Sequence, residues 1–240
     1  RRKVRSMSND VILQARNVAK VYERGGQSVN VLNSITLDVP RGDYVALMGP
    51  SGSGKTTLLN IIGGLDSPTS GSVVVDGTDI SALSDQGLAA WRSANIGFIF
   101  QQYNLLPVLT ALENVEFPLL LFKMGKQERR RRALAALELV GLAARAHHFP
   151  RQMSGGEEQR TSIARAMVTD PKLIIADEPT GNLDAAAAAN ILDLIERLNR
   201  DLKKTILMVT HDPNAGKRAK RLARLYKGDL STDPSTEAAA

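Results

Sequence analysis

The chain has no cysteine among its 240 residues, and aromatic side chains make up only 4% of it. The lack of cysteine excludes disulfides, thiolate metal sites and a cysteine nucleophile, so any bound metal must be held by oxygen. Long apolar stretches are missing too, because glutamate, asparagine and proline interrupt the most apolar region, 105–122. A membrane-spanning helix needs about 18 or more apolar residues, so we do not expect the chain itself to cross a membrane.

The rest of the composition is ordinary for a globular protein, with 43% hydrophobic and 23% charged residues. The length fits one large domain, which we place at 11–230, between a basic arm at 1–10 and a tail at 231–240. No apolar stretch follows the charges of the arm, so it is not a secretory signal. A net charge of +6 and a pI near 9.7 favour an anionic partner, which could be a nucleotide, a nucleic acid or acidic lipid.

A glycine-rich segment at 49–57 matches the pattern G-x-x-x-x-G-K-[ST] of a phosphate-binding loop (P-loop). It follows an apolar stretch, 44–48, typical of a buried parallel strand, and leads into a helical pattern at 56–62. Backbone N–H groups of such a loop turn onto phosphate oxygens, Lys55 adds a positive charge, and the Thr56 hydroxyl can ligate Mg²⁺. A plain glycine-rich turn is the alternative. The residues expected to bind the phosphates are Gly49, Pro50, Ser51, Gly52, Ser53, Gly54, Lys55, Thr56 and Thr57.

Apolar residues alternate with polar ones on the N-terminal side of this loop, between residues 11 and 39. The pattern predicts antiparallel strands, and a further hairpin at 73–77 is indicated by its Asp-Gly turn. Tyr22 lies in this region, just before two flexible glycines. Its ring could stack on a purine base or lie half-buried in a strand, and the spacing alone favours the strand residue.

Three later apolar segments also end in polar side chains. These segments and the residues that follow them are 96–100 with Gln101, 173–176 with Asp177 and Glu178, and 205–210 with His211. Ligands of an open parallel α/β sheet bind beyond the carboxyl ends of its strands, so these residues and the P-loop can share one crevice. Apolar residues at helical spacing from Ile191 to Leu202 predict the helix that crosses between the last two strands.

Asp177 and Glu178 supply two carboxylates with different roles. Asp177 can hold the Mg²⁺ shell, and Glu178 can accept the proton of a water that attacks a γ-phosphate. A solvated strand end is the alternative, but Pro179 follows immediately and fixes the turn. His211 could be an ordinary surface histidine, although its place at a strand end gives it reach to the same phosphate. These residues together predict nucleotide hydrolysis.

The pattern changes to helices from about residue 102 to 168, which indicates an inserted helical subdomain. Four successive arginines at 129–132 point around a helix, so we expect a solvated face, with contact to acidic lipid or a partner as the alternative. Ser154 and Glu157 have the spacing of a capping box at a helix start. The two glycines between them weaken a helix start, and they make sense if a phosphate approaches the backbone there.

These motifs resemble, in their order, those of the ATP-binding cassette (ABC) family, and they cover nearly the whole chain. The elements that carry the resemblance are the P-loop, Gln101, the Ser-Gly-Gly signature at 154–156, the segment 175–179, Asn182-Leu183-Asp184 and His211. Within the family, segments 63–71 and 104–115 are similar to the ATPases of lipoprotein-releasing and macrolide-exporting systems.

The chain departs from the family pattern at Met153, at Glu157 and Glu158, and in the alanine run 185–189. Methionine conserves the volume of the usual leucine, and a glutamate suits a helix N-terminus. Neither change affects the expected fold or ATP binding. The alanine run could alter contacts between subunits.

The resemblance implies an α/β fold with a parallel-sheet P-loop NTPase core, an N-terminal antiparallel β subdomain and an inserted α-helical subdomain. It also implies an ATPase that forms a head-to-tail homodimer, with each ATP between the P-loop of one copy and the signature of the other (Ser154, Gly155, Gly156 and Glu157). The roles that it implies are adenine stacking for Tyr22, Mg²⁺ ligation for Thr56 and Gln101, general base for Glu178, γ-phosphate contact for His211 and communication across the dimer for Asp184.

Two functions are open within the family. One is a transporter ATPase on the cytoplasmic face of a bacterial inner membrane, which drives separate permease subunits that export lipoproteins or hydrophobic, macrolide or peptide substrates. The other is a soluble ABC protein that acts on nucleic acid or ribosomes, for which a coiled-coil or zinc insertion, or a second cassette, would be expected. We favour the transporter and expect no nucleic-acid partner. A kinase would have no use for the signature.

The apolar, proline-broken segment 101–122 is the expected docking site for the permease. Its residues Leu105, Leu106, Leu109 and Phe117 are more apolar than a solvated loop requires, and an exposed apolar patch often marks an interface. Some of them must also belong to the core, and the sequence does not separate the two groups.

Overall fold

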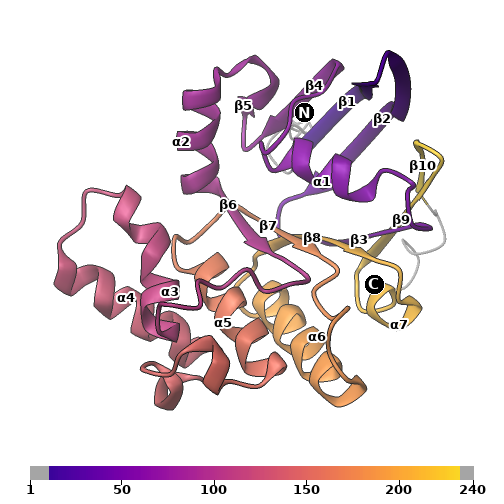
Figure 1. The fold of residues 1–240 in the computed structure, drawn as a ribbon. Helices are drawn as coiled ribbons and strands as arrows, with labels where there is room; N and C mark the ends of the chain where they lie inside the picture. The colour runs from indigo at the N-terminus through magenta and orange to yellow at the C-terminus, as the bar shows by residue number, and fades with distance from the viewer. Residues whose placement is uncertain (1–10, 233–240) are drawn as a thin grey trace, which may run out of the picture.

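The computed structural model describes residues 11–232, so the expected arm at 1–10 and the last eight residues of the expected tail lie outside the described residues. Two β-sheets stand one above the other, with helices between and beneath them (Figure 1). The strands are β1 (Val11–Arg24), β2 (Gln27–Pro40), β3 (Tyr44–Met48), β4 (Ser70–Val75), β5 (Thr78–Asp79), β6 (Ile96–Ile99), β7 (Leu173–Asp177), β8 (Thr205–Thr210), β9 (Arg221–Tyr226) and β10 (Asp229–Thr232).

Seven α-helices and four short 3-10 helices lie in the described part of the chain. The α-helices are α1 (Lys55–Ile62), α2 (Asp85–Asn95), α3 (Ala111–Glu116), α4 (Lys126–Leu139), α5 (Gly155–Met167), α6 (Ala185–Arg200) and α7 (Pro213–Gly216). The 3-10 helices are η2 (Ile80–Ala82), η3 (Phe117–Leu121), η4 (Ala143–Arg145) and η5 (Pro150–Gln152).

The larger sheet has the strand order β10-β9-β3-β8-β7-β6, and all neighbours run parallel except β10 and β9. Successive side chains of β3 enter opposite cores, as the pleat of a strand requires. Val45 and Leu47 pack into the core that contains α1, whereas Tyr44 and Ala46 pack into the core beneath the sheet. Both faces are therefore buried, which explains the continuous apolar strands.

The smaller sheet, in the order β2-β1-β4-β5, is antiparallel, and helix α1 lies between it and the larger sheet. Leu58, Leu59, Ile61 and Ile62 of this helix are all buried in the core that joins the two sheets. Burying an aliphatic side chain contributes about 1.5–3 kcal/mol, so four of them hold the helix firmly in place. The helix that begins at the P-loop is thus a fixed element, and its N-terminus has a fixed direction.

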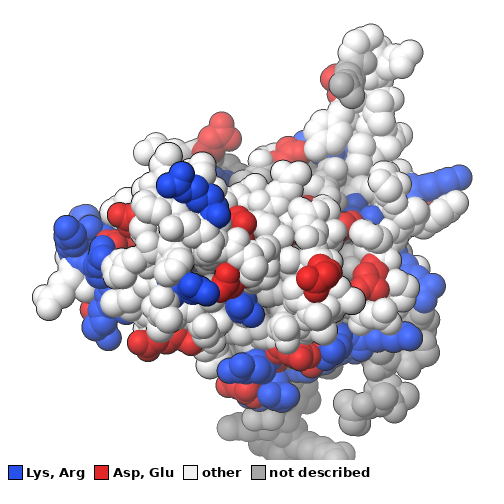
Figure 2. Space-filling model, turned by 60° about the horizontal axis from the view of Figure 1, so that its bottom comes forward, with Lys and Arg blue, Asp and Glu red and all other residues white. Residues whose placement is uncertain are grey.

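Helices α3, α4 and α5 form the helical subdomain at the lower left of Figure 1. The arginine run lies on α4, where Arg129 pairs with Glu116, and Arg131 and Arg132 both pair with Glu128. Figure 2 looks at the underside of the molecule, where basic side chains are interspersed with acidic and uncharged ones. The arginines shown in these pairs are therefore balanced within the subdomain, as expected for a solvated face.

Two expected boundaries differ from the structure. Helix α6 ends at Arg200, and Leu202 lies beyond it with 45% of its surface exposed, so it does not continue the apolar stripe. Strand β10 extends to Thr232, two residues into the segment that was expected to be tail. None of the helices in residues 11–232 is long and apolar enough to cross a membrane.

Candidate active site

The P-loop joins the end of β3 to the start of α1 in a shape that two of its glycines make possible. A Cβ on Gly49 would lie 2.1 Å from the carbonyl oxygen of Leu225, and one on Gly54 would lie 2.8 Å from that of Val31. Gly54 also has φ of +99° and precedes the helix, which has no side-chain cap and no acidic residue in its first turn. The N–H groups at this helix end are thus left for a ligand, and the helix dipole favours an anion.

Lys55 is almost fully buried behind the loop. Its ammonium donates to the carbonyl oxygens of Gly49 and Pro50, both at 2.8 Å. A pocket of about 260 Å³ opens in front of it, and its walls are Val31, Ser51, Gly52, Gly54, Lys55, Thr56, Thr57 and Glu178. A larger hollow of about 850 Å³ borders Gly49 and His211, but its walls contain neither Lys55 nor Glu178. The chemistry therefore places an anion in the smaller pocket.

Thr56 and Asp177 lie close enough to share a metal ion. The Thr56 hydroxyl donates to Oδ2 of Asp177 at 3.3 Å. Burial raises the pKa of the Asp177 carboxyl above its usual value, and nearby Glu178 adds to the rise, while Thr56 and Lys55 oppose it. Hydroxyl and carboxylate oxygens are the hard ligands that Mg²⁺ prefers, with phosphate oxygens completing its shell. The donor set fits the expected ion.

Glu178 follows strand β7 with an unusual backbone. Its φ is +46°, in the left-handed region that a residue with a side chain adopts at a cost of roughly 1–3 kcal/mol. Its N–H bonds to the carbonyl of Val209 at 2.9 Å, and its Oε2 lies 2.9 Å from Nδ1 of His211. The carboxylate lines the P-loop pocket. The fold thus holds the two expected catalytic side chains in contact beside the phosphate site.

Gln101, the third expected metal ligand, contacts Asn182 and is not among the walls of the P-loop pocket. Its side-chain amide donates to Oδ1 of Asn182 at 3.3 Å, and Asn182 returns a bond of 3.1 Å to the Gln101 carbonyl. A Cβ on Gly181 would lie 2.7 Å from this amide, so a side chain at position 181 would displace the glutamine from this placement. The bond to Asn182 uses the amide nitrogen of Gln101, whereas the amide oxygen is the atom that can ligate a metal.

The signature begins helix α5, away from the P-loop pocket. Ser154 and Glu157 form the expected capping box, with Glu157 accepting from the Ser154 N–H at 2.8 Å and pairing with Arg145 at 3.0 Å. The backbone bond from Ser154 and the Arg145 charge lower the pKa of Glu157 against a smaller effect of burial. Gly155 faces the Tyr103 hydroxyl and Leu183, and Gly156 faces Ala187 at the start of α6, where Asp184 caps the helix by accepting from Ala187 N–H at 2.8 Å. No signature residue lines the P-loop pocket.

Tyr22 lies near the end of β1 with 40% of its surface exposed. This partly exposed strand position agrees with the half-buried strand residue that its spacing favoured. Its hydroxyl donates to Oδ2 of Asp66 at 2.6 Å. Three contacts of this region were not anticipated from the sequence: Val31 in the wall of the pocket, Asn182 as the partner of Gln101, and Asp66 as the partner of Tyr22. Only Asn182 and Asp66 had a signal, since both lie in segments that carry the family resemblance.

Comparison with known proteins identifies the family. The family profile described as "ABC transporter" matches residues 32–181, which is well over half of the chain. The chain belongs to the ABC transporter family. An ABC protein named YknY from Bacillus subtilis is 50% identical over 219 residues, covering 91% of this chain and 95% of that protein. The lipoprotein-releasing system ATP-binding protein LolD of Bordetella pertussis is 47% identical over 92% of this chain and 96% of its own.

Solved structures give the same result for the fold. The dimeric ABC cassette MJ0796, in a post-hydrolysis state bound to ADP and Pi, matches with a TM-score of 0.84 and 42% identity, covering 92% of this chain and 98% of the other. A protein of the same name comes from Methanocaldococcus jannaschii. The expected fold class is confirmed, and so is the likeness to the lipoprotein-releasing group. This ABC cassette is an ATPase, and its neighbours form dimers.

Proposed function

We propose that this ABC ATPase drives a separate membrane permease, and that two copies of the chain build two ATP sites between them. The observation that carries the shared site is the separation within one chain. The P-loop pocket contains Lys55 and Glu178 but no residue of the signature, whose glycines face Tyr103, Leu183 and Ala187 instead. A second copy, turned head to tail, can bring its signature to the open side of the pocket.

Residues of the P-loop pocket and residues of the signature both have a role in this arrangement. Lys55 exchanges its two carbonyl partners for β- and γ-phosphate oxygens, and the uncapped N-terminus of α1 binds the same oxygens. Glu178 accepts a proton from the attacking water, and His211, in contact with it, donates to the γ-phosphate. Tyr22 stacks on the adenine, and the signature of the partner copy donates to the γ-phosphate. Asp184, at the start of α6, communicates between the two copies.

Mg²⁺ would be held by Thr56, Asp177 and the amide oxygen of Gln101, and would neutralise charge on the phosphates. The position of Gln101 is relevant to coupling, because the residue begins the segment that leads into the helical subdomain. Tyr103 and Asn104, just after it, both have positive φ. The carbonyls of both residues accept from the guanidinium of Arg165 on the signature helix α5. A shift of this segment would therefore move both Gln101 and the helix that carries the signature.

Mixing two inactive variants tests the shared site. Ser154→Arg blocks the signature and Lys55→Ala disables the P-loop, so neither homodimer can build a working site. A mixed dimer has one site formed from two intact halves. If subunits mix freely and sites act independently, ATPase activity should recover to about a quarter of the wild-type rate. Activity no higher than the sum of the two separate variants, with both folded by circular dichroism, would reject the shared site.

The permease is proposed to dock in a groove between the core and the helical subdomain. The groove has a volume of about 480 Å³, and part of its apolar wall comes from η3, through Phe117, Pro118, Leu120 and Leu121. Leu121 is 74% exposed, and Phe117 and Leu120 are also exposed, so this wall is an apolar surface that a partner could cover. The groove opens onto Asn104 and Arg165, so an occupant would touch the segment that follows Gln101.

This groove refines the expected docking segment. Leu106 is exposed, but it does not line the groove, and its backbone is held on both sides by the Asn114 side chain at 2.7 and 3.1 Å. Leu121→Glu is therefore a sharper test than Leu106→Glu, since it adds charge to the groove without touching the core. It should abolish co-purification with the permease and leave the ATPase rate of the free subunit within about twofold of the wild type. Leu202→Glu, an exposed leucine outside the groove, is the matched control.

The proposed place of the chain is the cytoplasmic face of a bacterial inner membrane, held there by its permease. The similarity to lipoprotein-releasing relatives supports a lipoprotein or another hydrophobic molecule as the cargo. Expression of the chain with candidate permeases would test this, and normal assembly of Leu121→Glu with its permease would argue against the docking groove.

A further inference from the structure

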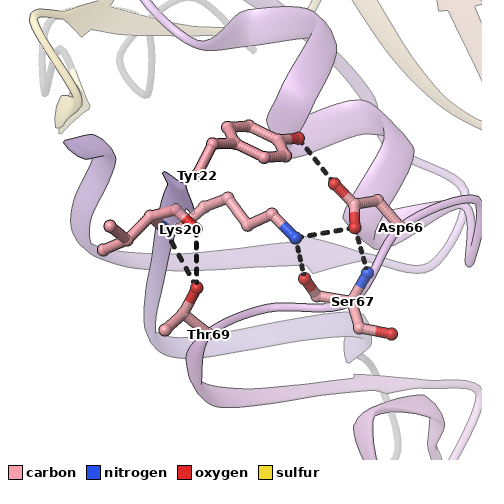
Figure 3. Close-up of polar contacts among 6 residues, drawn as sticks. Lys20, Tyr22, Asp66, Ser67 and Thr69 are labelled. Carbon is pink, nitrogen blue, oxygen red and sulfur yellow. Dashed lines mark hydrogen bonds and ion pairs between the residues drawn. The ribbon is translucent and has the colours of Figure 1, made fainter. Parts of the chain in front are cut away.

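Tyr22 belongs to a group of polar contacts that lies outside the phosphate pocket (Figure 3). Its hydroxyl bonds to one oxygen of Asp66 at 2.6 Å, and the other oxygen accepts from the Lys20 ammonium at 2.7 Å. The same oxygen of Asp66 also accepts from the N–H of Ser67 at 2.7 Å. We refer to Lys20, Tyr22 and Asp66 as the clasp.

Lys20 fixes the ring as well as the carboxylate. Its ammonium lies 4.7 Å from the centroid of the Tyr22 ring, over one face, and donates to the carbonyl oxygen of Ser67 at 2.7 Å. A cation in this position is attracted by the ring electrons. Because one face of the ring is covered, a base can stack only on the other.

The clasp joins strand β1 to the turn that follows helix α1. Thr69 in that turn accepts from the N–H of Val21 at 3.0 Å, and its own N–H donates to the carbonyl of Ala19 at 2.9 Å. The other end of the helix is the P-loop, and the helix is buried between the two sheets. The Tyr22 ring is thus set at a fixed distance and angle from the phosphate pocket.

Charge and burial agree with this geometry. Burial raises the pKa of the Asp66 carboxyl, but bonds from Lys20, Tyr22 and Ser67 outweigh it and leave the pKa below its usual value. The bond to Asp66 raises the pKa of the Tyr22 hydroxyl, so it stays a donor at neutral pH. Lys20 has only 11% of its side chain exposed, unusual for a lysine near the surface of a sheet. A solvated tyrosine would need none of these partners.

We propose that Asp66 and Lys20 are positioning residues that hold the Tyr22 ring ready for the purine base of the nucleotide. The inference rests on the proposed contact of Tyr22 with adenine and adds what prepares that contact. An aromatic ring that is already oriented loses less conformational freedom when the base arrives, which strengthens binding without new contacts. None of the three clasp residues lines the phosphate pocket, so the phosphates should be bound about equally well without the clasp.

The experiment compares two probes on the full-length chain. ATP carries both the base and the phosphates, whereas inorganic tripolyphosphate carries the phosphates alone. Tyr22→Leu should weaken ATP binding by about five- to a hundredfold, the range for losing one base–aromatic stack. Asp66→Ala and Tyr22→Phe, which each remove the same hydrogen bond, should both weaken it by about three- to tenfold. Tripolyphosphate affinity should stay within twofold in all three.

Combining variants separates positioning from mere stability. If Asp66 acts through the tyrosine, Asp66→Ala should add nothing to the ATP affinity of Tyr22→Leu. In steady state, Asp66→Ala should raise KM for ATP and leave kcat nearly unchanged. Asp38→Asn, which breaks the exposed pair of Asp38 with Arg16 in the same sheet, is the matched control and should change neither probe.

Three results would overturn the inference. Equal weakening of ATP and tripolyphosphate by Asp66→Ala would mean that the clasp supports the P-loop rather than the ring. No change with Asp66→Ala and Tyr22→Phe would mean that the ring needs no support. If Asp66→Ala does not fold, Tyr22→Phe alone decides, because it leaves Asp66 bound to Lys20 and Ser67. An unchanged ATP affinity in Tyr22→Leu would instead remove the adenine contact itself, and with it that part of the proposed function.

Discussion

The two phosphate-suited helix ends of this chain are built in opposite ways. At the start of α1, Gly54 offers no side-chain cap, no acidic residue lies in the first turn, and Lys55 adds a positive charge. At the start of α5, Ser154 and Glu157 close a capping box and two glutamates occupy the first turn. The first end leaves its N–H groups without a side-chain partner, as a phosphate site requires, and the second end satisfies them with its own side chains.

If the ATP site is shared between two copies, as proposed, the difference explains how a single chain can be stable with only one half of the site. A capped helix end has its N–H groups hydrogen-bonded without a partner, so the signature helix can be stable in a single subunit. The N–H groups at the P-loop end are available to a nucleotide. In its absence the Lys55 ammonium donates to two loop carbonyls. We therefore expect ATP to bind to one subunit first and the signature to arrive afterwards.

The largest effect is expected from a change that leaves both helix ends alone. Glu178→Gln removes the proposed base and keeps the shape of the side chain, so hydrolysis should fall by about a hundredfold or more. ATP binding should persist, and the variant should accumulate as an ATP-bound dimer, visible by size-exclusion chromatography. An ATP hydrolysis rate within threefold of the wild type would show that Glu178 is not the general base.

Lys55→Ala breaks the uncapped end. It removes a buried charge that should bind phosphate oxygens both before and during hydrolysis, so ATP affinity should fall by about ten- to a hundredfold. Isothermal titration with ATP measures the change. An affinity like that of the wild type would show that the helix end and loop suffice without the lysine.

Ser154→Ala breaks the capped end. Loss of an N-cap hydroxyl typically costs about 1 kcal/mol of the free energy of unfolding, and here it acts on the isolated subunit, with no nucleotide present. Urea denaturation of the free subunit checks this, with Ser154→Thr, which can still cap, as the control. Unchanged stability would mean that the capping box contributes little and that the serine is kept for the nucleotide alone.

Glu157→Gln sharpens the comparison with the smallest change. Glutamine can keep the capping bond to Ser154 but removes a negative charge from the place where a phosphate must approach. Association of ATP-bound subunits should strengthen by about two- to fivefold, the usual range for one charge at a helix end. Analytical ultracentrifugation in the Glu178→Gln background measures it. Weaker association would show that the Glu157–Arg145 pair itself contacts the partner.

The sequence predicted the family, the fold class and the ATPase activity correctly, because these depend on local patterns. The P-loop with its strand and helix, and the polar ends of β7 and β8, follow from short segments whose periodicity decides their structure. The end of helix α6 was not predicted, since Leu202 continues the apolar spacing whereas the helix ends at Arg200. The last strand, β10, extends two residues into the segment that was expected to be tail.

Side-chain pairings between distant segments could not be predicted. Gln101 rests on Asn182, 81 residues later, and Tyr22 on Asp66, 44 residues later, and no local pattern specifies either contact. The sequence also did not predict which residues of one apolar segment are exposed. Leu119 is buried, whereas Leu121, two residues on, is 74% exposed. In a 3-10 helix neighbouring side chains face different ways, and only packing decides which of them meets solvent.

The left-handed backbone at Glu178 lowers the stability of the fold at a position where the proposed chemistry needs a carboxylate. Selection for a robust fold alone would replace this residue with glycine, which adopts such a φ without steric cost. Glu178→Gly should therefore be inactive yet more stable than Glu178→Gln, which keeps the strain, by roughly 1 kcal/mol in the free energy of unfolding. A screen for thermal tolerance that ignores activity would be drawn to this substitution, so engineering of the cassette should hold the position fixed.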